Sequence, residues 1–302
     1  MNLEAALRDL ADRDPRVRAQ AADGLGRADG GERAQAIAAL SAAAVDEHAS
    51  VRYAALLSLG ELGAAGAVEI AAERLTDGEP LVREAAAIAL GELALAAAGE
   101  PPDAATNAAP NAVVERAWGA LAEALGYPQP EVRFQAIASL AQLDAARAAP
   151  LVRAALDDVD AKVRAQACAA LGDARDRGSA DALARLLDDA PDVRHEAALA
   201  LARMGDRRGA AWLVEALDHR DLALDAAQAL AELGVAGDER AHAALARVLG
   251  RLLGDPLVKV RAAEALARSG DARGRRHLER AARARRDDVR GLAQTVLSEL
   301  PK

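Results

Sequence analysis

Asp192-Val193-Arg194-His195-Glu196-Ala197-Ala198-Leu199-Ala200-Leu201-Ala202-Arg203-Met204-Gly205 is one copy of a pattern that recurs along the whole chain. If its Val193 is counted as position 0, Ala197 stands at position 4 and Leu201 at position 8. At about 100° per residue, positions 0, 4, 8 and 11 fall within an arc of about 80°. The copy therefore predicts an amphipathic α-helix that buries its Val, Ala and Leu side chains.

Nine copies of this pattern follow one another, and seven of the eight intervals between them lie near 30 residues, which identifies an internal repeat. The anchors at position 0 are Val17, Val51, Val82, Val132, Val163, Val193, Leu222, Val258 and Val289. Position 4 is Ala and position 8 is Leu in every copy. A looser apolar segment precedes each anchor, so each repeat is predicted to be a helix, a turn and a second helix.

Stacked helix pairs bury their apolar faces against one another, which neither helix of a pair does alone. Hydrophobic residues make up 52% of the 302 residues but aromatic residues only 2%, and small aliphatic side chains favour close packing of helices over a β-sandwich. We therefore predict an all-α fold, a right-handed α-α superhelix of about nine helix pairs. It forms one solenoid over residues 1–302.

The interval of 50 residues between Val82 and Val132 contains an insertion at 97–111. This segment is rich in Pro, Ala and Asn and has no apolar period, so we predict a flexible loop there and not a domain boundary. A tolerated surface insertion and a functional lid or docking loop both remain open.

The repeat resembles the short HEAT-like repeat named after phycobilisome lyases. The segment from Asp160 to Asp173, with Val163-Arg164, Ala167 and Leu171-Gly172, carries the resemblance most clearly. The resemblance covers nearly the whole chain except the insertion, and it implies a HEAT-like solenoid. Repeats of this type occur in bilin lyases, in deoxyhypusine hydroxylase and in bacterial scaffold proteins, so the resemblance is more specific for fold than for function.

Position 1 is Arg in most copies, at about 100° on the flank of the buried arc. The resemblance implies that these arginines form a structural ladder with acidic residues of neighbouring turns; a row of ligand-binding arginines is the alternative. Arg–carboxylate pairs of this kind fix geometry better than they add stability. The predicted ladder consists of Arg18, Arg52, Arg83, Arg133, Arg164 and Arg194.

No catalytic or metal site is predicted. His195-Glu196 resembles the His-Glu dipeptides that together hold two irons in deoxyhypusine hydroxylase, but no other copy has the dipeptide at these positions. One dipeptide does not supply the several converging ligands that such a centre needs. Cys168 flanks the core arc and is predicted to be a buried apolar residue. We expect no cofactor.

Positions 2, 3, 6 and 10 point away from the buried arc. The resemblance implies that the second helices line the concave side, where these positions form a groove floor. We predict that exposed apolar residues there bind a partner, with Tyr53, Phe134 and Leu224 as anchors; packing on neighbouring repeats is the alternative. The predicted partner-binding residues are Tyr53, Leu57, Ile88, Phe134, His195, Leu199, Leu224 and Val260.

The chain has a net charge of −9, but residues 259–302 hold 12 basic and six acidic side chains. Three interpretations remain open for this basic end. It is a solvated end cap, a docking site for an acidic partner or the acidic front of another copy, or a contact for nucleic acid. The residues predicted to dock electrostatically are Arg273, Arg275, Arg276, Arg280 and Arg283.

We therefore expect a non-catalytic scaffold that binds a partner peptide or protein on its concave face. One alternative is a bilin-lyase-like accessory protein that positions a chromophore or an acceptor protein. Another is nucleic-acid binding through the basic C-terminal end, which the net negative charge of the chain disfavours. The single cysteine favours the reducing cytoplasm, and no run of 18 apolar residues predicts a membrane span.

Overall fold

The computed structural model describes residues 3–99 and 110–300. These residues form α-helices and short 3-10 helices, and no β-strand occurs among them, so the all-α prediction is confirmed. The chain divides into two compact units, Met1–Ala155 and Leu156–Lys302. We describe each unit by itself.

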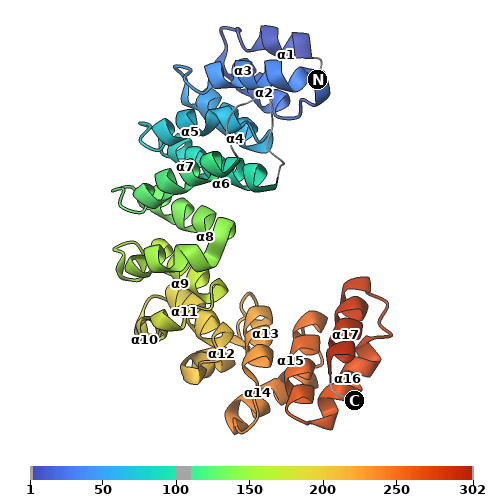
Figure 1. Cartoon of the computed structure of the whole chain (residues 1–302). Helices are drawn as coiled ribbons and strands as arrows, with labels where there is room; N and C mark the ends of the chain where they lie inside the picture. The colour runs from blue at the N-terminus through green and yellow to red at the C-terminus, as the bar shows by residue number, and fades with distance from the viewer. Residues whose placement is uncertain (1–2, 100–109, 301–302) are drawn as a thin grey trace. The chain divides into compact units, whose positions relative to one another are not determined.

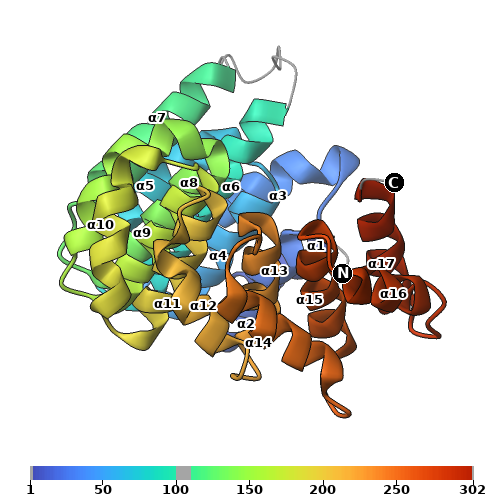
Figure 2. The same cartoon turned by 90° about the horizontal axis from the view of Figure 1, so that it is seen from below.

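The first unit is a stack of helix pairs. Its helices are α1 (Leu3–Asp9), α2 (Pro15–Leu25), α3 (Arg33–Ala43), α4 (Ala49–Glu61), α5 (Val68–Arg74), α6 (Pro80–Gly99), α7 (Pro110–Ala124) and α8 (Pro130–Val152). The second helices α2, α4, α6 and α8 pack side by side in one layer, and α3, α5 and α7 lie in the other (Figures 1 and 2). Helix α8 is broken at Asp144, whose φ of −160° and ψ of 96° are not helical. Its residues 145–152 therefore form a separate helical segment after the break.

The second unit repeats this arrangement. Its helices are α9 (Ala161–Asp173), α10 (Ala180–Arg185), α11 (Pro191–Arg203), α12 (Ala210–Ala216), α13 (Ala223–Leu233), α14 (Glu239–Gly250), α15 (Pro256–Arg268), α16 (Ala272–Ala281) and α17 (Asp287–Glu299). The second helices α9, α11, α13, α15 and α17 each pack on the next one along the chain. Figure 1 shows them in chain order from yellow-green to red.

The anchors mark the second helices closely. Eight of the nine second helices in the described residues begin two residues before their anchor, and α13 begins one residue after Leu222. The Ala at position 4 is buried in all nine, and the Leu at position 8 is buried in all except Leu297, which is half-buried. The predicted HEAT-like solenoid of about nine helix pairs is confirmed.

The segment between α6 and α7 is shorter than the insertion predicted at 97–111. Helix α6 continues to Gly99 and α7 begins at Pro110, so both ends of the 97–111 segment are helical. Helix α6 packs on α7 as well as on α8, and its buried residues end at Ala94. Residues 100–109 lie outside the described residues, and the predicted loop there stays a prediction.

Neighbouring second helices approach closely because small residues line their contact. Position 9 is Gly in four copies: Gly26, Gly60, Gly91 and Gly172. A Cβ on Gly172 would lie 2.8 Å from the Cα of Ala200 on the next second helix. Position 7 is Ser in two copies, and its hydroxyl donates to a carbonyl of the preceding second helix. Ser58 Oγ donates to Ala22 O (3.1 Å) and Ser139 Oγ to Ala87 O (3.2 Å).

We predict that Gly172→Ala lowers the free energy of unfolding by about 1–3 kcal/mol, because the added methyl meets backbone that does not move independently. Gly291→Ala is the matched control. Gly291 lies exposed within α17 with open space around it, so alanine should be neutral or stabilising by about 0.5–1 kcal/mol. Urea titrations followed by circular dichroism measure both; equal midpoints for the two variants would contradict the close contact.

Candidate functional site

Three ladder arginines make the same set of hydrogen bonds. Arg18, Arg52 and Arg164 each donate through Nε and Nη2 to both carboxylate oxygens of an aspartate in the following repeat, at 2.7–2.9 Å. Each Nη1 donates to two backbone carbonyls of the turn before its own helix. The acceptors are Asp46, Asp77 and Asp189, in that order.

The two ladder aspartates of the first unit, Asp46 and Asp77, each contact two successive arginines. The side chain of Asp46 accepts from Arg18, while its backbone carbonyl accepts from Arg52 Nη1 (2.9 Å). Asp77 does the same for Arg52 and Arg83. Each arginine therefore links the turn before its own helix to the turn of the following repeat. The aspartate that accepts from its side chain also accepts, through its backbone carbonyl, from the next arginine.

Arg133 shares the backbone part of this arrangement, since its Nη1 donates to the carbonyls of Tyr127 and Pro128. Arg83 and Arg194 differ from it. Arg83 donates through Nε and Nη2 to Oε1 of Glu131, across the insertion. Arg194 donates to the carbonyl of Asp189 (3.2 Å) and lies 5.1 Å above the Trp212 ring. Its Nε is buried without a hydrogen-bond partner among the described residues. Among the described residues, Arg194 therefore does not form the two hydrogen bonds to one carboxylate that Arg18, Arg52 and Arg164 form.

The ladder carboxylates are held in their charged form. The hydrogen bond from Arg18 lowers the pKa of Asp46, against a smaller opposing effect of burial. The hydrogen bond from Arg164 lowers the pKa of Asp189 in the same way. Such charge-assisted, forked pairs specify the spacing of the turns. These arginines thus have their donors engaged within the solenoid.

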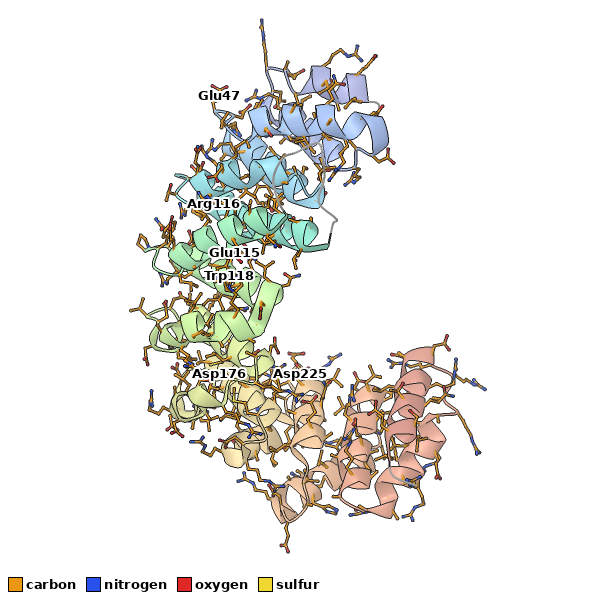
Figure 3. The ribbon with its side chains drawn as sticks, in the orientation of Figure 1. Glu47, Glu115, Arg116, Trp118, Asp176 and Asp225 are labelled. Carbon is orange, nitrogen blue, oxygen red and sulfur yellow. The ribbon has the colours of Figure 1, made fainter. Side chains whose placement is uncertain are left out.

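We predict that Arg52→Ala lowers the free energy of unfolding by about 3 kcal/mol, because it leaves Asp77 buried and charged without its partner. The side chains of Arg52 and Asp77 are 13% and 4% exposed. Arg116→Ala is the control, since Arg116 on α7 pairs with Glu69 and the two side chains are 45% and 64% exposed (Figure 3). An exposed pair contributes less than about 1 kcal/mol. Similar losses in urea titrations of the two variants would contradict the structural role of the ladder.

The predicted partner-binding residues do not share one environment. Tyr53 is 36% exposed, and Leu57, Ile88, Phe134 and Leu224 are half-buried. Four of these five lie on α4, α6 and α8, which are successive second helices of the first unit. The structure therefore gathers accessible apolar side chains on one layer of that unit.

The other three predicted residues are buried, so their predicted exposure is wrong. His195 is 6%, Leu199 7% and Val260 0% exposed. Position 2, occupied by His195 and Val260, lies only about 20° from position 9, which packs on the next second helix. Val260 accordingly packs in a core with residues of α16 and α17. Leu199 belongs to the core shared with α12 and α13.

Acidic side chains accompany the apolar ones on the layer of second helices in the first unit. Glu61 on α4 and Glu92 on α6 both occupy position 10. Burial raises the pKa of Glu92, and the charge of Glu61 raises it further. Glu92 Oε2 is buried without a hydrogen-bond partner among the described residues. This face of the first unit therefore combines apolar and acidic side chains.

The basic C-terminal residues are only partly available for docking. Arg273 Nε donates to Asp271 Oδ1 (3.2 Å) and Oδ2 (2.9 Å), and Nη2 donates to Oδ2 (2.7 Å), so its guanidinium is engaged within the chain. Arg280 Nε donates to the carbonyl of Arg276 (3.3 Å). Arg275, Arg276, Arg280 and Arg283 are exposed on or just after α16. The electrostatic docking site stays a prediction.

Neither the cysteine nor the possible metal ligands among the described residues are arranged for nucleophilic or metal chemistry. Cys168 is fully buried, and burial raises the pKa of its thiol to about 12, which disfavours the thiolate. Within residues 3–99 and 110–300, no three His, Cys, Asp or Glu side chains are grouped as ligands for a metal ion. Among the described helices, none is both long and apolar enough to cross a membrane.

The family model for HEAT repeats matches residues 2–91 and 150–231, which is more than half of the chain. The chain belongs to the HEAT-repeat family. No curated protein matches it. The solved structure of YibA from Escherichia coli is similar over 88% of this chain and 92% of YibA, with 18% identity and a TM-score of 0.63.

Two further solved structures contain HEAT-like chains in complexes. Kap95p, described as binding RanGDP in relation to nuclear import, is similar over 98% of this chain, with 14% identity and a TM-score of 0.60. This HEAT-repeat chain spans only 46% of Kap95p, about half its length. The CpcE–CpcF complex of the phycocyanin lyase from Nostoc matches 82% of this chain and 93% of that one, at 23% identity and a TM-score of 0.46. The likenesses to YibA and Kap95p show the fold alone.

Proposed function

We propose that this HEAT-repeat protein is a non-catalytic scaffold that binds a protein partner on the layer of its second helices. The observation that carries the proposal is the placement of Tyr53, Leu57, Ile88 and Phe134. The chain has only two Tyr and one Phe, yet Tyr53 and Phe134 lie on this layer and outside the fully buried core. Accessible aromatic and aliphatic side chains grouped on a rigid layer are typical of protein-binding surfaces.

The rigid framework beneath this surface also supports binding. The glycine and serine contacts and the arginine ladder hold successive second helices at fixed spacing within a unit. Partner-binding side chains on such a framework lose little conformational freedom on association. Kap95p, which shares the fold, binds RanGDP, so a solenoid of this kind is able to present a protein-binding face. We place the protein in the cytoplasm, since its one cysteine is free and buried.

We predict that Tyr53→Ala/Leu57→Ala lowers the recovery of the partner at least tenfold when the tagged protein is purified from its native cells. The two truncations remove apolar contact area while leaving the buried core residues of α4 unchanged. Quantitative mass spectrometry of the co-purifying proteins measures the recovery.

Val45→Ala/Leu81→Ala is the matched control. These side chains are 58% and 64% exposed, and they lie in the α3–α4 turn and at the start of α6. The control should retain the partner. Equal recovery with the Tyr53/Leu57 variant, if its circular dichroism and unfolding midpoint match those of the unaltered protein, would reject this surface as the binding site.

A further inference from the structure

Two leucines in the turn between α14 and α15 are almost fully exposed. Leu252 is 99% and Leu253 91% exposed, and they stand next to each other in the turn 251–255 of the second unit. Single exposed apolar side chains are common on protein surfaces, but adjacent large ones leave a continuous apolar patch in water. Such a patch indicates a surface that another molecule covers.

Side-chain hydrogen bonds hold this turn against the helices beneath it. Arg251 Nη1 donates to the carbonyl of Leu217 (3.2 Å), and its Nη2 donates to Asp218 Oδ1. Lys259 Nζ on α15 donates to the carbonyl of Arg251 (2.5 Å). At the other end of the turn, Asp255 is the N-cap of α15. Both ends of the turn are therefore fixed, and its backbone loses little conformational freedom when the leucines bind.

An apolar pocket of about 200 Å³ opens beside the same turn. Arg251 and Gly254 of the turn line it, and its apolar walls are Leu217, Ala223, Val248 and Val258. An apolar cavity of about 150 Å³ holds a benzene molecule, so this pocket has room for the four side-chain carbons of a leucine. Because Leu252 and Leu253 are almost fully exposed, they do not fill the pocket of their own chain.

We propose that a second copy of this chain covers the two leucines, with a leucine of each copy in the pocket of the other. The chain carries a protruding apolar pair and an apolar pocket side by side, and one turn contributes to both. In a two-fold symmetric dimer the same patch meets itself, so a protrusion beside a pocket is self-complementary. Both contacts form at once, and neither patch remains open to a third copy.

The charges around the pocket suit a contact between identical surfaces. The rim carries the acidic Asp218 and Asp255 and the basic Arg220, Arg251 and Lys259. Two copies of a patch with one sign of charge would repel each other, whereas a mixed rim lets the bases of one copy face the acids of the other. Arg220 is exposed and forms no ion pair among the described residues, so it is available for such a contact.

Sedimentation velocity of the full chain, from micromolar to submillimolar concentration, tests this dimer. We expect a weak, concentration-dependent dimer, because two leucines from each copy bury less area than an obligate interface does. Leu252→Ser/Leu253→Ser should raise the dissociation constant at least tenfold, since the apolar contacts are lost. Val159→Ser is the matched control. Val159 is 93% exposed in the corresponding turn of another repeat of the same unit, and its replacement should change the dissociation constant less than twofold.

A second variant separates the pocket from the leucines. Ala223→Met fills the pocket with a larger side chain and should also weaken the dimer at least tenfold, although both leucines are retained. A mixture of this variant with Leu252→Ser/Leu253→Ser restores one of the two contacts, since the first supplies leucines and the second an open pocket. The mixture should therefore associate more tightly than either variant alone. Circular dichroism checks that each variant keeps the helical content of the unaltered protein.

The proposal is overturned if the unaltered protein is monomeric at every concentration, or if the leucine variant dimerises as tightly as the unaltered protein. It is also overturned if Val159→Ser loses as much affinity, if a folded Ala223→Met variant keeps the full affinity, or if the mixture associates no better than its components. A monomer that needs its leucines to bind a different protein rejects the second copy as the occupant. These outcomes are separate from those of the proposed function, because Tyr53 and Leu57 lie in the first unit.

Discussion

The contact between one second helix and the next determines the rest of this structure. Glycine and serine at positions 9 and 7 bring the backbones together, as between Gly172 and Ala200 or Ser58 and Ala22. A forked arginine such as Arg52 then ties each turn to the following one through Asp77. The first contact sets the distance between helices, and the second fixes their register. Side chains that point away from both contacts are displayed at regular intervals.

Because these contacts use only some positions of the repeat, the residue type can vary at the others. Positions 4 and 8 must fill a shared core, and position 1 must reach the neighbouring turn, so Ala, Leu and Arg recur there. Positions 3, 6 and 10 meet no such requirement in the first unit, where they include Leu57, Ile88 and Glu92. The second unit uses the same positions for Glu196 and Asp225. The surface chemistry of each unit can therefore change without altering how its helices stack.

Much of the fold follows from the sequence, because a helical period is a local property that nine copies report independently. The second helices begin where the anchors predict, and Arg18, Arg52 and Arg164 make contacts that position 1 allows. The candidate surface was harder to predict. The angle from the core alone predicts that His195 and Val260 are exposed, yet both are buried, whereas Tyr53 and Phe134 at the same position remain accessible. The glycine at position 9 marks the side that packs on the next second helix, so burial at position 2 depends on that helix as well as on the angle.

Other features depend on neighbours that a single repeat does not specify. Arg273 belongs to a basic run, but Asp271 two residues earlier engages it. Arg194 has the ladder position, yet Asp218, at the place where the next carboxylate would be expected, pairs with Arg251 instead. The unpartnered nitrogens of His195 emerge only when the burial and the surroundings of the ring are both known. Pairing and burial of this kind are tertiary properties, and the repeat pattern carries no direct signal for them.

Site-specific photocrosslinking in native cells tests most directly whether the layer of second helices binds the partner. A photoreactive phenylalanine analogue is placed at Leu57, on that layer, and in a separate variant at Val45, in the α3–α4 turn. We expect the probe at position 57 to crosslink a discrete protein partner and the probe at position 45 to crosslink none. Crosslinks to a discrete protein from position 45, with none from position 57, would contradict the assignment of this face.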